Sequence, residues 1–374
     1  MNREILIINN NLDTGGVEII LQNLTKVFDE RGYKITLWAS NGSRKVVRER
    51  FPDSVAFRKY PFWNVNCKRF SPKWFFSRIS RVMFEKLILR LKKWPLVVAF
   101  KEGEDMVLAS KLRARRKVAW VHTDYGAFHW TGYCFANDEA ERLCMAGFDA
   151  VAVVSEAAGR GLVQAIGDPG NLQVVYNPID YDHIEKRARA HCPQRPKDKA
   201  VLVCVGRLSA VKRHSMLIDI CNELSEQFPL ELWIVGGGEL EEELQRKLVD
   251  ENIHCVKLLG QQRNPYPYIA CADWLVSASE TESYGLTVQE ALVLGVPVIA
   301  CRCPAIEENM SEDFGILAGM DKEQLKEAIC RALSEKELHT GYARSIAEGY
   351  DKSRLWEERL EKMYKFIVGE ESST

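Results

Sequence analysis

The stretch SETESYGLTVQEALVLGVPVIA, residues 279–300, decides the fold class. It runs from a polar loop into an apolar segment that begins near Leu286, and it then passes Gly295 and Pro297 before the apolar run VPVIA. Glycine and proline at these places end a helix. The stretch therefore predicts a loop, a short helix and a buried strand, which is the repeating unit of an α/β protein.

The same alternation of strand and helix continues in both directions along the chain. In the N-terminal half, a strand over residues 4–9 precedes Gly15-Gly16, a helix with apolar residues at helical spacing over 17–28, and a strand over 34–40. In the C-terminal half the expected order is strand 200–208, helix 214–228, strand 231–238, helix 240–252, strand 255–260 and strand 272–279. Such alternation indicates parallel sheets covered on both faces, so we expect two doubly wound, Rossmann-like α/β domains in tandem.

Proline and charged residues gather between the two halves, over residues 176–200, which predicts an interdomain linker. The length of 374 residues suits two domains. We place the N-terminal domain at residues 1–177 and the C-terminal domain at residues 178–351, followed by a last helix over about 352–370.

The composition excludes several classes of protein. Hydrophobic residues make up 46% of the chain and charged residues 28%, as in soluble globular proteins. The eleven scattered cysteines form no disulfide framework and suggest reduced thiols, and Cys301 and Cys303 lack the partners of a zinc site. MNREILIINN does not read as a signal peptide, and no apolar run approaches a spanning length of about 20 residues. We therefore expect a cytoplasmic protein without a metal cofactor.

Positive charge is concentrated in residues 41–117, which hold 21 Lys and Arg against 6 Asp and Glu, a local net charge of +15 within a chain of net charge −1. Aromatic residues are interleaved with these cations over 60–94, among them Trp63, Trp74 and Trp94. Aromatic rings with Lys and Arg suit the surface of an anionic membrane. The alternatives are a solvated basic face and core aromatic residues on helices with basic outer faces.

Glu282 and Glu290 stand eight residues apart, which on a continuous helix places them about 80° apart around the axis. They can still share a site if Glu282 lies in the loop and Glu290 lies one turn inside a helix that begins near Gly285. The backbone N–H groups at the start of that helix would form an anion site. A phosphate there, beside two carboxylates that accept hydrogen bonds from hydroxyl groups, suits a sugar nucleotide.

Three further elements follow predicted strands. Arg207 and Lys212 in VGRLSAVKRH supply two cations for a diphosphate, Gly15-Gly16 lets a ligand approach the backbone, and His122 follows the strand VAWVH. Ligands of open α/β sheets bind at the carboxyl ends of the strands. We therefore expect these elements and the two glutamates to line one cleft between the domains.

Taken in order along the chain, these motifs resemble those of the family 4 glycosyltransferases with the GT-B fold. The motifs are GGVE, VHTD, VAVVSE, YNPID, GRLSAVK and the E-x7-E of ETESYGLTVQE followed by EALVLGVPVIA. Two departures stand out: YNPID lacks the glycine of NGID-type linkers, and VGGGEL has Gly238 where many members carry an acidic residue. The second departure bears on donor specificity.

The resemblance implies a role for each matching residue. Arg207 and Lys212 would neutralise the donor diphosphate in place of a metal, Glu282 would face the donor sugar, and Glu290 would bind the ribose. The last helix would pack back onto the N-terminal domain. The remaining donor-binding positions would be the loop residues Ser283, Tyr284, Gly285 and Leu286, together with Gly15 and Gly16. The expected catalytic residues are His122, Arg207, Lys212 and Glu282.

The function implied is retaining transfer of a hexose or N-acetylhexosamine from a nucleotide-sugar, UDP more than GDP, to a hydroxyl group. The acceptor would be a lipid-linked or membrane-associated glycan at the inner face of the cell membrane, in cell-surface polysaccharide synthesis. A sugar-nucleotide epimerase or a glycan phosphorylase is the alternative on the same fold. An NAD-dependent dehydrogenase would need G-x-G-x-x-G after the first strand, and INNNLDTGGVE lacks it. No RNA- or DNA-binding motif accompanies the basic region, so no nucleic-acid partner is expected.

Overall fold

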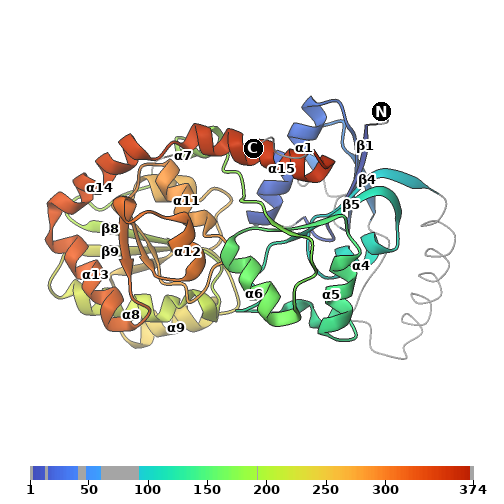
Figure 1. Ribbon diagram of the computed structural model, residues 1–374. Coiled ribbons are helices and arrows are strands. Elements are labelled where there is room, and N and C mark those ends of the chain that lie inside the picture. The colour runs from blue at the N-terminus through green and yellow to red at the C-terminus, as the bar shows by residue number, and fades with distance from the viewer. Residues whose placement is uncertain (1–2, 13–15, 41–47, 60–91, 192, 371–374) are drawn as a thin grey trace. The chain divides into compact units, whose positions relative to one another are not determined.

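The computed structural model describes residues 3–12, 16–40, 48–59, 92–191 and 193–370. The chain divides into two compact units (Figure 1). Unit 1 comprises Met1–Pro178 and Glu358–Thr374, and unit 2 comprises Ile179–Glu357. The chain therefore enters unit 2 after Pro178 and returns to unit 1 within its last helix.

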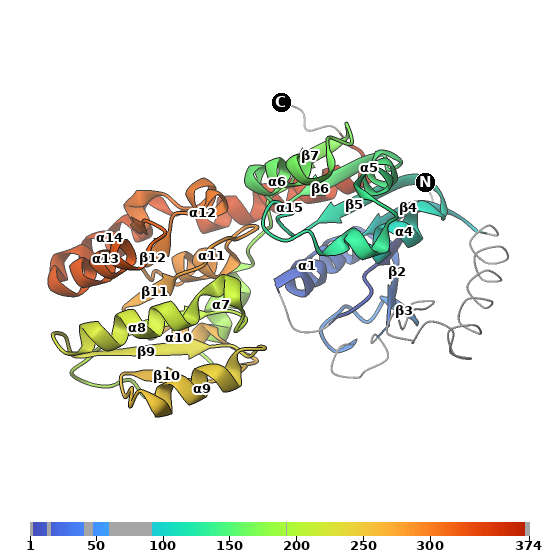
Figure 2. The same ribbon diagram turned by 90° about the horizontal axis from the view of Figure 1, so that it is seen from below.

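Unit 1 contains a parallel sheet of seven strands in the order β3-β2-β1-β4-β5-β6-β7. Figure 2 shows β3 and β2 at one edge of this sheet and β6 and β7 at the other. The strand order reverses direction beside β1, as in nucleotide-binding α/β folds. The strands are β1 Glu4–Ile8, β2 Lys34–Ala39, β3 Ala56–Lys59, β4 Lys93–Ala99, β5 Arg113–Val121, β6 Ala150–Val153 and β7 Leu172–Val174.

Helices cover both faces of this sheet because its strands are apolar on both sides. Alternate residues of β1, β4 and β5 pack with α4, α5 and α6 in one core cluster. On the opposite face, the ring of Trp120 packs against the ring of Phe366 in α15, with 5.3 Å between the ring centroids. Arg116 on the same face donates hydrogen bonds to the carbonyl oxygens of Phe366 and Ile367. The helical segments of this unit are α1 Gly16–Glu30, α4 Glu104–Ser110, η1 Trp130–Cys134, α5 Asp138–Ala146 and α6 Glu156–Ile166, and α15 Lys352–Val368 begins in unit 2.

Unit 2 contains a parallel sheet of six strands in the order β10-β9-β8-β11-β12-β13. Figure 1 shows β8 and β9 between α8 and α9 on one side and α7 and α11 on the other. The core cluster on the first side joins the sheet to α8, α9 and α13. The strands are β8 Ala200–Val205, β9 Leu230–Val235, β10 Val256–Leu258, β11 Trp274–Ser277, β12 Val298–Cys301 and β13 Gly315–Ala318.

Two helices of unit 2, α7 and α13, begin after an aspartate whose side chain accepts a hydrogen bond from a free backbone N–H group. Asp180, in the sequence DYD, accepts a hydrogen bond from the backbone N–H of His183 at 3.0 Å and so caps α7. Asp321 caps α13 in the same way through Gln324. The helical segments are α7 Tyr181–Ala188, η2 Ala210–Lys212, α8 His214–Ser225, α9 Glu241–Asp250, α10 Tyr266–Ala270, α11 Leu286–Val293, α12 Pro304–Asn309, η3 Glu312–Phe314, α13 Lys322–Ser334 and α14 Lys336–Gly349.

Of the two interpretations of the aromatic residues over 60–94, the structure supports the core at one residue, Trp94. Trp94 lies in β4, is 7% exposed and belongs to the core of unit 1, because its position in the strand faces the sheet's helices. The ammonium group of Lys92 lies over its ring at 3.6 Å. Residues 41–47 and 60–91, which include Trp63 and Trp74, lie outside the described residues. Over the part of the chain that is described, none of the helices combines the length and apolar character needed to cross a bilayer.

Candidate active site

Two glycine contacts shape the loop that follows β8. A Cβ atom at Gly236 would lie 1.8 Å from the carbonyl oxygen of Gly206, and one at Gly238 would lie 2.4 Å from that of Leu208. The backbone N–H of Leu208 donates to the carbonyl oxygen of Gly237 at 3.0 Å, so the loops after β8 and β9 are held together. The third glycine of VGGGEL is therefore required for packing, which the sequence did not reveal.

Lys212 and Glu282 form an ion pair between the loops that follow β8 and β11. The Lys212 Nζ lies 2.5 Å from Glu282 Oε1, and both side chains are largely buried. The hydroxyl of Ser279 donates to the same carboxylate oxygen at 2.8 Å. β8 and β11 are neighbours in the sheet, so the two loops leave the same edge. A cation and a hydroxyl-accepting carboxylate are thus fixed side by side.

The helix of the opening stretch, α11, starts at Leu286, as the sequence predicts. Gly285 precedes it in a left-handed conformation with φ of 81°, and a Cβ there would lie 2.5 Å from Ile306 Cδ1. Tyr284 is buried and Ser283 is half-buried. Glu282 therefore lies in the loop, and Glu290 lies inside the helix. The first backbone N–H groups of α11 are the donors that a helix start leaves without helical partners.

Glu290 lies beside Tyr266 of α10. The Tyr266 hydroxyl donates to Glu290 Oε1 at 3.4 Å. Burial raises the pKa of Glu290 to about 7, and the hydrogen bond from Tyr266 opposes this shift. Burial also raises the pKa of Tyr266, so its hydroxyl remains a donor. Glu290 is therefore poised between its neutral and ionised forms near neutral pH.

Arg207 lies in the loop after β8 with an exposed side chain. Its carbonyl oxygen accepts a hydrogen bond from the N–H of Ser209 at 2.9 Å, which bends the loop toward Lys212. The structure thus brings Lys212 and Glu282 into contact and pairs Glu290 with Tyr266. Arg207 is left with its guanidinium in solvent, where a planar fork of donors can meet phosphate oxygens.

His122 follows β5 in unit 1, and its hydrogen bonds define its tautomer. Its Nε2 lies 3.0 Å from the carbonyl oxygen of Phe100, and because a carbonyl only accepts, Nε2 carries the proton. Burial lowers the pKa of His122 to about 4, so the ring is neutral at pH 7. Nδ1 then carries a lone pair that can accept a hydrogen bond from a hydroxyl group.

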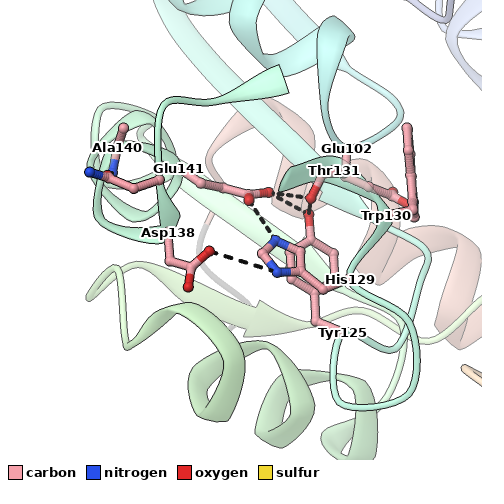
Figure 3. A network of polar contacts seen from close by, with 9 residues as sticks. Glu102, Tyr125, His129, Trp130, Thr131, Asp138, Ala140 and Glu141 are labelled. Carbon is pink, nitrogen blue, oxygen red and sulfur yellow. Dashed lines mark hydrogen bonds and ion pairs between the residues drawn. The ribbon is translucent and has the colours of Figure 1, made fainter. Parts of the chain in front are cut away.

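Two buried carboxylates hold the loop that follows His122. Glu102 is 1% exposed and accepts hydrogen bonds from the backbone N–H of His122 at 3.0 Å and from Trp130 Nε1 at 3.0 Å. Glu141 of α5 accepts from Tyr125, Thr131 and His129 at 2.7 to 2.8 Å (Figure 3). These bonds fix the loop over residues 123–134 in one conformation.

The glycine pair of the first domain is described in part. Gly16 is the first residue of α1, and Gly15 lies outside the described residues. The end of β1 just before this turn is tied to α4, because the backbone N–H of Asn10 donates to the carboxylate of Asp105 at 3.2 Å. The start of α1 therefore follows a fixed strand end.

Several residues of the site carried no signal in the sequence. Ser279 and Tyr266 are joined to the two glutamates only through the fold, and a serine or a tyrosine at those places is unremarkable in one sequence. Glu102 and Glu141 look like surface charges, although both are buried. The charge run KRH also holds Arg213, whose guanidinium donates to the carbonyl oxygens of Ala278 and Met320.

Comparison with known proteins identifies the family and the fold. A family model described as Glycosyltransferase Family 4 matches residues 14–183, and one described as Glycosyl transferases group 1 matches residues 199–335. A curated relative from Campylobacter jejuni, N-acetylgalactosamine-N,N'-diacetylbacillosaminyl-diphospho-undecaprenol 4-alpha-N-acetylgalactosaminyltransferase, is 29% identical over 208 residues. That match covers 54% of this chain and 54% of the relative, so the chain spans about half of that relative's length.

Two further likenesses extend over nearly the whole chain. An uncharacterized glycosyltransferase of Haemophilus influenzae is 21% identical over 352 residues, which cover 92% of this chain and 95% of that protein. The solved structure of Anabaena HepE in complex with UDP and glucose is similar to this chain, with a TM-score of 0.71 and 16% sequence identity. The match covers 97% of this chain and 100% of the HepE chain. These findings confirm the predicted GT-B fold.

Proposed function

Because the chain belongs to the family 4 glycosyltransferases, we propose that it transfers a hexose or N-acetylhexosamine from a UDP-sugar to a hydroxyl group of a lipid-linked or glycan acceptor. The observation that carries this proposal is the Lys212–Glu282 pair beside the start of α11. It combines a cation for a phosphate with a carboxylate for sugar hydroxyl groups. Known relatives are named for such transfers, and HepE was solved with UDP.

In the proposed reaction the bond between the anomeric carbon and the donor phosphate oxygen breaks. The acceptor oxygen then bonds to the same face of that carbon, so the configuration is retained, and its proton passes to the leaving phosphate. Lys212, Arg207 and the N–H groups of α11 stabilise the negative charge that develops on the diphosphate. This assigns charge stabilisation to the protein and proton acceptance to the leaving group.

The carboxylates and His122 position the donor in this proposal. Glu282 accepts hydrogen bonds from the donor sugar, and Glu290 accepts them from the ribose. The lone pair on Nδ1 of His122 accepts one from a further sugar hydroxyl. Supporting these roles, His122 and Glu282 lie in the loops that follow β5 and β11, and Glu290 lies in α11.

A thermal unfolding experiment tests donor binding. UDP-glucose and UDP-N-acetylglucosamine at about 100 times Kd are expected to raise the unfolding free energy by about 2.7 kcal/mol, roughly 5–10 °C in Tm. Arg207→Ala is expected to remove most of this protection without changing the unliganded Tm, because the side chain is exposed. Arg246→Ala, an exposed arginine on α9, is the matched control and should keep full protection. If only GDP-sugars protected the protein, a UDP-sugar could not be the donor. If Arg207→Ala bound UDP-sugars normally, the assignment of Arg207 to the donor site would be wrong.

The pKa of Glu290 gives donor binding a pH dependence. A ribose hydroxyl donates to the ionised carboxylate, so binding releases the proton that Glu290 holds below a pKa of about 7. The affinity for UDP-glucose is therefore expected to rise by about 30-fold between about pH 5.5 and 8, in step with the ionised fraction of Glu290. As the pH rises from 4.5 to about 7, the free energy of unfolding should fall, because in this interval Glu290 is protonated in the native state and ionised in the unfolded state. Isothermal titration across this range should give a flat profile for Glu290→Gln, and a flat wild-type profile would contradict the assignment.

A membrane-associated acceptor and a place at the inner face of the cell membrane belong to the same proposal. They rest on the +15 charge of residues 41–117. An epimerase or a phosphorylase on the same fold is separated from a transferase by one measurement. A transferase releases free UDP from a UDP-sugar in proportion to the added acceptor, whereas an epimerase releases none and a phosphorylase requires inorganic phosphate.

A further inference from the structure

Arg213 has a backbone conformation that arginine rarely adopts. It stands between η2 and α8 with φ of 50° and ψ of 38°, in the left-handed region. Glycine enters this region without steric cost, whereas a residue with a Cβ does not. The arginine side chain must therefore make contacts that offset the cost of this turn.

The guanidinium group of Arg213 binds main-chain carbonyl groups at the ends of two strands. Its Nε donates to the carbonyl oxygen of Ala278 and its Nη1 to that of Met320, each at 2.6 Å. Ala278 follows β11 and Met320 follows β13, and β12 lies between these strands. The planar fork of arginine presents Nε and Nη1 to the two carbonyl groups from separate, fixed positions, whereas the three donors of an ammonium group radiate from one nitrogen.

These contacts reach both members of the ion pair. Arg213 directly follows Lys212 in the chain, and its fork holds the segment from Ala278 to Ser279, whose hydroxyl group binds Glu282. One residue further on, the backbone N–H of Glu280 donates to the carbonyl oxygen of Val211 at 2.9 Å. The loops after β8 and β11 are thus joined by main-chain and side-chain bonds centred on Arg213.

We propose that Arg213 is a positioning residue for the donor site. It positions Lys212 through the left-handed turn, and it positions Glu282 through the carbonyl group of Ala278, which precedes Ser279. The guanidinium of Arg213 donates its short hydrogen bonds to carbonyl oxygens of the protein. Arg213 therefore acts through Lys212 and Glu282 and does not touch the donor. This inference rests on the proposed function, because it assigns Lys212 and Glu282 to the donor.

Arg213→Gly tests the proposal, because glycine keeps the turn and removes the guanidinium. The affinity for UDP, measured by isothermal titration, is expected to fall by about 10-fold to 100-fold, since small displacements of binding groups have effects of this size. The Tm should change little, because glycine relieves the left-handed cost as the contacts are lost. Added methylguanidinium should restore part of the affinity of Arg213→Gly and none of that of Lys212→Met.

A second measurement does not depend on the ligand. Hydrogen exchange of the unliganded protein should become faster in residues 278–285 of Arg213→Gly and remain unchanged in the matched control Asn252→Gly. Asn252 also has a positive φ, 54°, at the end of α9. Unchanged exchange in residues 278–285, or unchanged UDP affinity despite faster exchange, would overturn the proposal. A wild-type protein that binds no UDP would refute the proposed donor, while the exchange result would still decide the role of Arg213.

Discussion

Lys212→Met is expected to lower kcat for sugar transfer by about 10²–10³-fold, the largest effect on activity of any single change proposed for this chain. Methionine fills a similar volume but cannot stabilise the charge that develops on the leaving diphosphate. It also leaves Glu282 with the Ser279 hydroxyl and without its cation. The rate of UDP release from a UDP-sugar, measured with a glycan acceptor, gives the result.

Lys322→Met is the matched control for this experiment. Lys322 of α13 forms an ion pair with Glu223 of α8 in the same unit, with 2.6 Å between Nζ and Oε1. Both side chains are more exposed than those of Lys212 and Glu282. Exposed pairs of this kind contribute little to stability, so activity and Tm should remain close to those of the wild type. A Lys212→Met enzyme with activity within a few-fold of the wild type would show that Lys212 does not act on the leaving group.

The sequence predicted the fold class because strands and helices leave strong local patterns. All six residues of β9 are buried and five of them are apolar, and the stop signals at Gly295 and Pro297 mark the end of α11. These features depend on neighbouring residues, so one sequence contains them.

The interactions within the site could not be predicted in the same way. Lys212 and Glu282 are 70 residues apart, and the contact between them depends on the adjacent positions of β8 and β11 in the sheet. The raised pKa of Glu290 depends on burial beside Tyr266, which no spacing of residues reports. At Trp94 two interpretations, a membrane surface and a core residue, were open from the sequence, and the position in the strand decides for the core.

Glu141→Ala is expected to have the largest effect on stability. Glu141 is 0% exposed and accepts hydrogen bonds from Tyr125, Thr131 and His129 (Figure 3). Alanine would leave the buried Tyr125 hydroxyl without its acceptor, while Thr131 Oγ1 would still donate to the Tyr125 hydroxyl at 3.1 Å. An uncompensated buried donor is costly. The expected loss is about 3–5 kcal/mol in the free energy of unfolding, measured by urea denaturation with tryptophan fluorescence.

Two variants on the same helix separate this network from a general effect of lost charge. Glu141→Gln keeps a carbonyl oxygen for Tyr125 and Thr131, so it should lose about 1–2 kcal/mol. Glu139→Ala removes an exposed carboxylate that binds only Arg142 among the contacts described for its side chain, and the unfolding midpoint should not move. Because the loop fixed by Glu141 directly follows His122, hydrogen exchange in residues 123–134 should rise in Glu141→Ala alone. Equal stability of Glu141→Ala and Glu139→Ala would mean that the buried network does not hold the loop.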